Sequence, residues 1–255
     1  MTPSSDHNIN YFKEGAVLVL QINRPEKKNA LTPSMYKALG EGIELADADA
    51  SINVVMITGT EDCFTSGNDV NSFVAGQEVE GERPSLIFMR AISTAQKPIV
   101  AAVSGLAIGI GTTMLAHCDL VYASEECFLQ MPFSRLGVCP ELASSLLLPQ
   151  FMGHQRAAEL LMLGDRFTSE KAREYGLVND VLPQGEYLSF AKNKAKELAS
   201  LPNGALRITK GLMKRRFENE LPDTMETELK EFNKLLQSPE AQEIVQAFLN
   251  RKKTG

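Results

Sequence analysis

The sequence predicts an α/β fold followed by a helical C-terminal region. Short apolar runs typical of buried strands alternate with amphipathic helical patterns in the first part of the chain. From Glu186 onward the pattern is helical, with breaks expected near Pro202, Pro222 and Pro239. We therefore expect a core over residues 1–195 and a helical region over residues 196–255.

The elements of the core follow from apolar spacing and from helix-capping residues. Val17–Ile22 and Val54–Thr58 have the composition of strands in a sheet that is covered on both faces. Thr32 is expected to cap a helix in which Pro33 takes the first position. Further helices are expected over residues 86–94, 154–163 and 169–175, and further strands over residues 120–123, 127–131 and 177–182.

The composition is that of an ordinary globular protein. The 255 residues are 44% hydrophobic and 23% charged, and the net charge of -6 argues against a nucleic-acid partner. The four cysteines lack a C-x-x-C spacing, and no metal-binding histidine pattern accompanies them, so we expect reduced thiols and no metal site. Because neither terminus carries a secretory or S-K-L peroxisomal signal, a cytoplasmic protein is expected.

Residues 98–118 contain no Asp, Glu, Lys or Arg, which raises the question of a membrane span. The proline and three glycines within this stretch argue against one. A strand over Ile99–Val103, a glycine-rich turn over residues 104–111 and a helix from near Thr112 fit better. Such a turn can direct backbone N–H groups at a bound negative charge, although a plain tight turn is the alternative.

The loop formed by residues 64–69, FTSGND, also follows a predicted strand. A Gly-Asn-Asp sequence is most often only a turn. The functional interpretation is a second backbone N–H aimed at the same point as the first. Two such groups form an oxyanion hole, and the loss of one donor typically costs about 3 kcal/mol of transition-state stabilisation.

Glu141 is the acid that the sequence singles out. It follows Pro140, which we expect to open a helix running to Leu148, and it precedes an apolar run. An acid in the first turn of a helix is most often a partner of the helix dipole, which favours its ionised form. Burial among apolar side chains would instead raise its pKa and suit the group to act as a general base.

Five segments, taken in order, resemble the crotonase (enoyl-CoA hydratase/isomerase) superfamily. They are NRPEKKNAL, FTSGND, KPIVAAVSGLAIGIG, CDLVYAS and FTSEKAREYGLVNDVLP, and the resemblance runs from about residue 10 to about residue 250. It implies a crotonase-type spiral of ββα units with a C-terminal helical trimerisation region. It also implies an acyl-CoA thioester substrate, no separate cofactor, and a homotrimer or a dimer of trimers.

The resemblance places the two backbone donors at Asn68 and Ile110. The two glutamates of the family's hydratases would fall at Thr113 and Phe133, where this chain has no acid, so water addition by that route is disfavoured. The segment GVCPELASS resembles the peroxisomal-type Δ3,Δ2-enoyl-CoA isomerases, which implies that Glu141 is the catalytic base.

Further substrate-binding residues are implied by the same motifs: Lys28, Ala30, Thr65, Ser66, Gly67, Asp69, Phe73, Gly109, Gly111 and Phe133. The Lys27–Ala30 loop is expected to face CoA, with a solvated basic turn as the alternative. Phe73, Leu86, Met89 and Phe133 are candidates for the acyl pocket. Two other functions stay open: a hydratase or another crotonase reaction that recruits Asp69 or Glu61 as a second acid, and a non-catalytic acyl-CoA-binding module.

Overall fold

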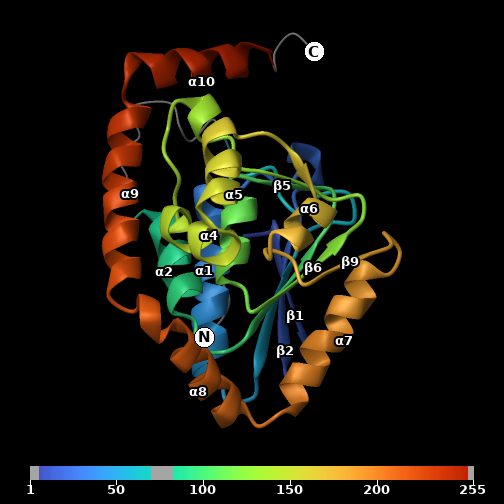
Figure 1. Ribbon diagram of the computed structural model, residues 1–255. Coiled ribbons are helices and arrows are strands. Elements are labelled where there is room, and N and C mark those ends of the chain that lie inside the picture. The colour runs from blue at the N-terminus through green and yellow to red at the C-terminus, as the bar shows by residue number, and fades with distance from the viewer. Residues whose placement is uncertain (1–5, 70–82, 252–255) are drawn as a thin grey trace.

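The computed structural model, which describes residues 6–69 and 83–251, contains a main sheet of parallel strands with one antiparallel edge (Figure 1). Its strand order is β1-β2-β3-β4-β6-β9. The strands are β1 (Ile9–Glu14), β2 (Val17–Ile22), β3 (Val54–Thr58), β4 (Ile99–Val103), β6 (Leu120–Ser124) and β9 (Asp180–Leu182). β1 pairs antiparallel with β2, and the other neighbours are parallel. The predicted strands are confirmed, except that the last begins at Asp180 rather than at residue 177.

A second, three-stranded sheet joins β5 (Leu106–Ile108), β7 (Phe128–Gln130) and β8 (Phe167–Thr168). The chain passes from β4 to β5 and again from β6 to β7, so these two turns of the chain each contribute a strand to both sheets. The expectation that residues 104–111 form only a turn is therefore wrong. β5 pairs with β7, which comes much later in the sequence, so no local pattern indicated it.

Helices cover both faces of the main sheet. α1 (Pro33–Ala48) and α2 (Pro84–Thr94) lie on one side, and α7 (Tyr187–Ser200) lies on the other (Figure 1). Within β2, Leu18 and Leu20 join the core beneath α1, whereas Val17 and Val19 join the core beneath α7. This alternation is the period-two pattern of a strand buried on both faces.

Several helix boundaries agree with the sequence, and two do not. The Thr32 hydroxyl accepts the N–H of Met35 at 3.3 Å, which confirms the predicted cap. α3 (Ile110–Thr113) begins at Ile110 rather than Thr112 and continues as a 3₁₀ turn (Met114–His117). The remaining core helices are α4 (Ser144–Met152), α5 (His154–Ala158), which continues as a π-helical turn (Glu159–Leu163), and α6 (Ser169–Glu174).

The helix expected from Pro140 to Leu148 begins later, at Ser144. Leu142 and Ala143 have φ angles of 59° and 51°, which place them in the left-handed region. A right-handed helix cannot run through two such residues. Glu141 therefore lies in a turn before α4 and not in the first turn of a helix.

The C-terminal region consists of α8 (Asn203–Lys214), α9 (Glu220–Leu236) and α10 (Pro239–Arg251). The breaks expected near Pro202, Pro222 and Pro239 are confirmed, and Pro222 itself lies just after its break, in the first turn of α9, where proline is tolerated. α9 packs against α4 (Figure 1). The boundary expected at residue 195 lies within α7 and stays a prediction. None of the helices in the described ranges is both long and apolar enough to cross a membrane.

Candidate active site

Three segments that are distant in sequence run side by side at one end of the sheets. The N–H of Leu31 donates to the carbonyl oxygen of Gly67 at 2.8 Å, which joins the loop after β2 to the loop after β3. The N–H of Thr65 donates to Leu106 at 2.8 Å, and that of Ile108 donates back to Thr65 at 3.0 Å. The FTSGND loop is therefore held between the loop after β2 and the glycine-rich segment around β5.

Asn29 links the loop after β2 to the FTSGND loop through hydrogen bonds of its side chain and backbone. Its buried side-chain Nδ2 donates to the carbonyl oxygens of Cys63 at 2.6 Å and Phe64 at 3.2 Å, and its Oδ1 accepts the Arg24 N–H at 2.7 Å. Its own carbonyl oxygen accepts the Thr65 hydroxyl at 2.7 Å. Asn29 has a φ of 55°, a left-handed conformation that asparagine tolerates better than most residues. The NRPEKKNAL motif thus contributes a buried amide that holds the site loop in place.

Glycine is required on both sides of the contact between the two turns. Gly67 has a φ of 88°, and a Cβ there would lie 2.7 Å from the carbonyl oxygen of Ile108. Gly109 has φ 57° and ψ −118°, a combination that is essentially reserved for glycine. Each glycine is followed by a residue, Asn68 or Ile110, whose N–H donates in no hydrogen bond between described residues. Two unused backbone donors at adjacent turns can bind an oxygen that carries negative charge.

Glu141 is a buried carboxyl group with an unused oxygen. The residue is 8% exposed, and its Oε1 has no hydrogen-bond partner in the part of the chain that the structure describes. Burial, with a smaller contribution from the charge of Glu228, raises the pKa of Glu141 to about 8. The Tyr36 hydroxyl, whose pKa is raised by burial and then by the charge of Glu141, donates to Oδ1 of Asn68. The Tyr36 hydroxyl therefore contacts the side chain of Asn68 and is close enough to Glu141 for the charge of that acid to raise the Tyr36 pKa.

The expected influence of a helix N-terminus on Glu141 is not found. The N–H groups of Ala143 and Ser145, at the start of α4, donate to the Glu228 carboxylate at 2.7 Å and 3.0 Å. The helix N-terminus thus stabilises Glu228, while Glu141 experiences chiefly burial. Of the two opposing influences predicted from the sequence, the one that makes a stronger base prevails.

Residues 12–255 match the sequence model of the enoyl-CoA hydratase/isomerase family. The chain belongs to that family. It is 33% identical over 245 residues to enoyl-CoA delta isomerase 2 of Rattus norvegicus, an alignment that covers 94% of this chain. The chain spans 62% of the length of that relative.

Two further comparisons show the breadth of the family. The chain is 30% identical over 243 residues to 2,3-dehydroadipyl-CoA hydratase of Escherichia coli, with 94% of each protein covered. It is also similar to the solved structure of Pseudomonas aeruginosa OdaA, with a TM-score of 0.92 and 43% identity over 95% of this chain and 99% of that chain. The fold is therefore the crotonase spiral that the sequence motifs implied.

The structure brings together most of the residues that the crotonase motifs singled out. Lys28 is exposed, and its carbonyl oxygen accepts the N–H of Ser66 at 3.0 Å, while Ala30 beside it is buried. Asp69 forms an ion pair with Arg24 at 2.8 Å. The loop expected to face CoA is thus packed directly against the FTSGND turn.

The remaining predicted residues lie on the β5 side of the site or beyond the described ranges. A Cβ on Gly111 would lie 2.5 Å from the Thr65 side chain, so the start of α3 packs tightly against that turn. Phe133 is buried just after β7, whose Gln130 carbonyl oxygen accepts the Gly109 N–H at 2.8 Å. Phe73 lies outside the described residues.

Three residues near Glu141 were not assigned a role from the sequence: Tyr36, His117 and Glu228. His117 is a polar residue within the uncharged stretch. This was the one sequence signal that could have drawn attention to any of the three residues. Its Nε2 lies 2.9 Å from the carbonyl oxygen of Leu142, and burial lowers its pKa to about 4. Tyr36 sits on an amphipathic helix, and Glu228 is one of several acids in α9, so neither position was distinctive.

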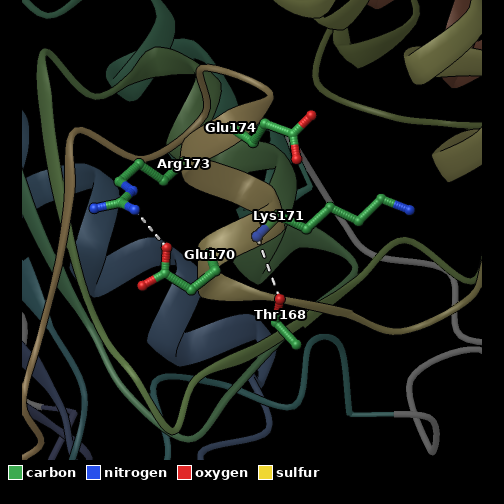
Figure 2. Close-up of a pocket in the computed structure, with 5 residues that line it drawn as sticks. All are labelled: Thr168, Glu170, Lys171, Arg173 and Glu174. Atoms are coloured by element: carbon green, nitrogen blue, oxygen red, sulfur yellow. Dashed lines mark hydrogen bonds and ion pairs between the residues drawn. The ribbon is translucent and has the colours of Figure 1, made fainter.

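A charged depression on α6 is separate from this site. Figure 2 shows the residues that line it: Thr168, Glu170, Lys171, Arg173 and Glu174. Arg173 pairs with Glu170 at 2.7 Å, and the Thr168 hydroxyl caps the helix through the Lys171 N–H at 3.2 Å. These are paired surface charges on one helix. Within residues 6–69 and 83–251, no group of three or more His, Cys, Asp or Glu side chains is arranged to hold a metal ion.

Proposed function

We propose that this chain is an enoyl-CoA Δ-isomerase that converts 3-enoyl-CoA into 2-enoyl-CoA, an auxiliary step of fatty acid β-oxidation. The observation that carries the proposal is Glu141, a buried carboxyl group with an unpartnered oxygen and a pKa of about 8. A base of this pKa is suited to abstracting and returning a proton near neutral pH. The similarity to enoyl-CoA delta isomerase 2 supports the same choice.

In the proposed mechanism the thioester oxygen accepts hydrogen bonds from the N–H groups of Asn68 and Ile110. Glu141 removes a proton from C2 of the 3-enoyl-CoA, and the electrons of the C2–H bond delocalise onto the thioester oxygen. The two N–H groups stabilise the resulting dienolate. Glu141 then returns its proton to C4 as the double bond moves between C2 and C3. The reaction requires no redox group or covalent intermediate, so the proposal includes no cofactor.

A single base distinguishes this reaction from hydration, which needs a second group to activate water. Thr113 and Phe133 stand where the resemblance would place the acids of a hydratase. Of the two candidate second acids, Asp69 is paired with Arg24 at 2.8 Å and Glu61 is exposed on the surface. These surroundings favour isomerisation over water addition.

The substrate and assembly parts of the proposal rest on the motifs and on surface chemistry. We propose that Lys28 and Ala30 contact CoA and that Phe133 contributes to the acyl pocket. We also propose a homotrimer or a dimer of trimers, supported by the exposed apolar side chains Ile208 and Leu212 on α8. A sedimentation measurement would test the assembly. The cytoplasmic location stays a prediction.

The direct test is the ultraviolet absorbance of purified protein incubated with 3-hexenoyl-CoA, which rises as the product becomes conjugated. We expect turnover by the wild type and a loss of at least about 100-fold in Glu141→Gln, since a general base typically contributes that much. Glu226→Gln, an exposed acid on α9, is the matched control and should keep full activity.

Two other outcomes would replace the proposal. Incorporation of solvent oxygen into a 3-hydroxyacyl-CoA would identify a hydratase. Tight binding of acyl-CoA without turnover of short or long enoyl-CoA substrates would identify a binding module. Full isomerase activity in Glu141→Gln would remove Glu141 from the mechanism.

A further inference from the structure

Glu228 reaches from the C-terminal helix α9 to the turn that carries Glu141. It is 7% exposed, and its Oε2 accepts the Ala143 N–H at 2.7 Å. Its Oε1 accepts both the N–H of Ser145, at 3.0 Å, and the Ser145 hydroxyl. One carboxylate thus holds three donors that lie immediately after Glu141 in the chain.

This turn needs to be held because its backbone is strained. Leu142 and Ala143 both have left-handed φ angles, 59° and 51°, and neither is glycine. A side chain makes this conformation unfavourable, because Cβ comes too close to the following carbonyl oxygen. Such residues persist only where surrounding contacts fix them, and they are often found at active sites.

The contacts that fix the turn come from different parts of the fold. His117, in the 3₁₀ turn after α3, lies with its Nε2 2.9 Å from the carbonyl oxygen of Leu142. A carbonyl oxygen only accepts, so Nε2 carries the hydrogen of this neutral ring. The Ser144 hydroxyl donates to the Glu141 carbonyl oxygen at 2.7 Å. Of these contacts, only that of Glu228 comes from the C-terminal helices.

We propose that Glu228 is a positioning residue whose carboxylate fixes the left-handed turn from which Glu141 projects, so that a C-terminal helix completes the active site. This inference rests on the proposed role of Glu141 as the base. Without Glu228 the N–H groups of Ala143 and Ser145 lose their acceptor, and the strained turn loses the contact that opposes its relaxation. The Glu141 carboxyl group would then move away from the reacting carbon atoms.

Glu228 also contributes charge to the site. The titratable groups that face Glu141 are Tyr36 from α1, Glu228 from α9, and Cys139 in the segment before the turn. His117 is neutral above its pKa of about 4, and burial raises the pKa of Cys139 to about 11, so the thiol is protonated near neutral pH. Burial raises the pKa of Glu228 as well, while the donors of Ala143 and Ser145 favour its charged form, and in that form its negative charge opposes ionisation of Glu141. Removal of that charge should lower the pKa of Glu141.

The test compares Glu228→Gln and Glu228→Ala with wild type, using the conjugation assay across a range of pH. Glutamine keeps the size of the side chain and one oxygen acceptor, but it carries no charge. We expect Glu228→Ala to lose about 100-fold in kcat with KM little changed, since a displacement of about 1 Å can cost that much. Glu228→Gln should recover part of kcat, and the midpoint of its pH–rate profile should lie at lower pH than in the wild type.

A measurement that needs no turnover separates this inference from the proposed function. The difference infrared spectrum of wild type minus Glu141→Gln isolates the titration of Glu141, and the same difference is taken in the Glu228→Gln background. A lower midpoint in the Glu228→Gln background supports the inference even if no enoyl-CoA is turned over. The absence of turnover would reject only the proposed function. An unchanged midpoint in the infrared titration would overturn the inference. So would a kcat and a pH profile equal to those of the wild type in folded Glu228→Gln. If Glu228→Ala does not fold, Glu228→Gln still decides.

Discussion

Replacing Glu141 with glutamine should stabilise the protein, and the gain should grow with pH. In the folded protein the pKa of Glu141 is about 8, against a usual value of 4.5. Above pH 4.5 the unfolded chain releases this proton, while the folded protein retains it until about pH 8. Because the folded state binds more protons over this interval, the stability of the wild type falls as pH rises. Glutamine cannot be ionised and escapes this loss.

The size of the effect follows from the shift. Each unit of pKa difference corresponds to about 1.4 kcal/mol, so the gain for Glu141→Gln should increase by about 3 kcal/mol between about pH 5 and about pH 8. Any change in packing or hydrogen bonding caused by the amide adds a constant offset. The slope against pH, and not the absolute gain, therefore reports the burial of an uncompensated carboxylate.

Urea unfolding of both proteins at several pH values, at one fixed protein concentration, measures this slope. Glu226→Gln, which replaces an exposed acid on α9, serves as the control. A pH-independent difference between Glu141→Gln and wild type would refute the reasoning. It would mean that the carboxylate is as well accommodated in the folded protein as in water.

Three further outcomes are expected. The isomerase kcat/KM should rise with pH and level off above about pH 8, as Glu141 loses its proton, and a flat profile would contradict its role as the base. Gly67→Ala should destabilise the protein by about 2 kcal/mol in urea unfolding, because its φ is 88° and a Cβ would meet a backbone oxygen at 2.7 Å. Gly204→Ala is the control and should not destabilise the protein, because a Cβ there meets nothing within 4 Å. Lys210→Met should cost about 3 kcal/mol in the same measurement, because it leaves the carboxylate of Asp119 without its 2.7 Å partner, and the added change Asp119→Asn should restore part of the loss.

The sequence was most informative where local chemistry determines local structure. Val54–Thr58 and Ile99–Val103 are continuous apolar runs because parallel strands are covered on both faces, and both strands were predicted with their observed limits. The cap at Thr32 was likewise predictable, because a hydroxyl followed by proline satisfies the free N–H groups of a helix start. The turn at Gly67 was also located from its composition, whereas the second glycine-rich stretch contains β5, which was not predicted.

The turn around Glu141 was not predictable from local patterns. Pro140 followed by an acid and an apolar run has the appearance of a helix start, yet Leu142 and Ala143 adopt left-handed conformations that their side chains disfavour. The contacts that hold this turn come from His117 and Glu228, which are far away in the sequence. Periodicity carries no information about such pairings, so the sequence singled out Glu141 but not the residues that hold the turn after it.

The C-terminal helices contribute to the core as well as to the assembly that we propose for them. Lys210 of α8 is 3% exposed and donates to the Lys97 carbonyl oxygen at 2.8 Å and to Asp119 at 2.7 Å, at the two ends of the uncharged stretch. Glu228 of α9 supplies the acceptor for the start of α4. A buried charge is tolerated only where its partner is present, so each of these helices must be docked before the core is electrostatically complete. Glu141 differs, because within the described residues its Oε1 has no hydrogen-bond partner. This suits the role of base that we propose for it, since an oxygen already engaged by a donor would be a weaker base.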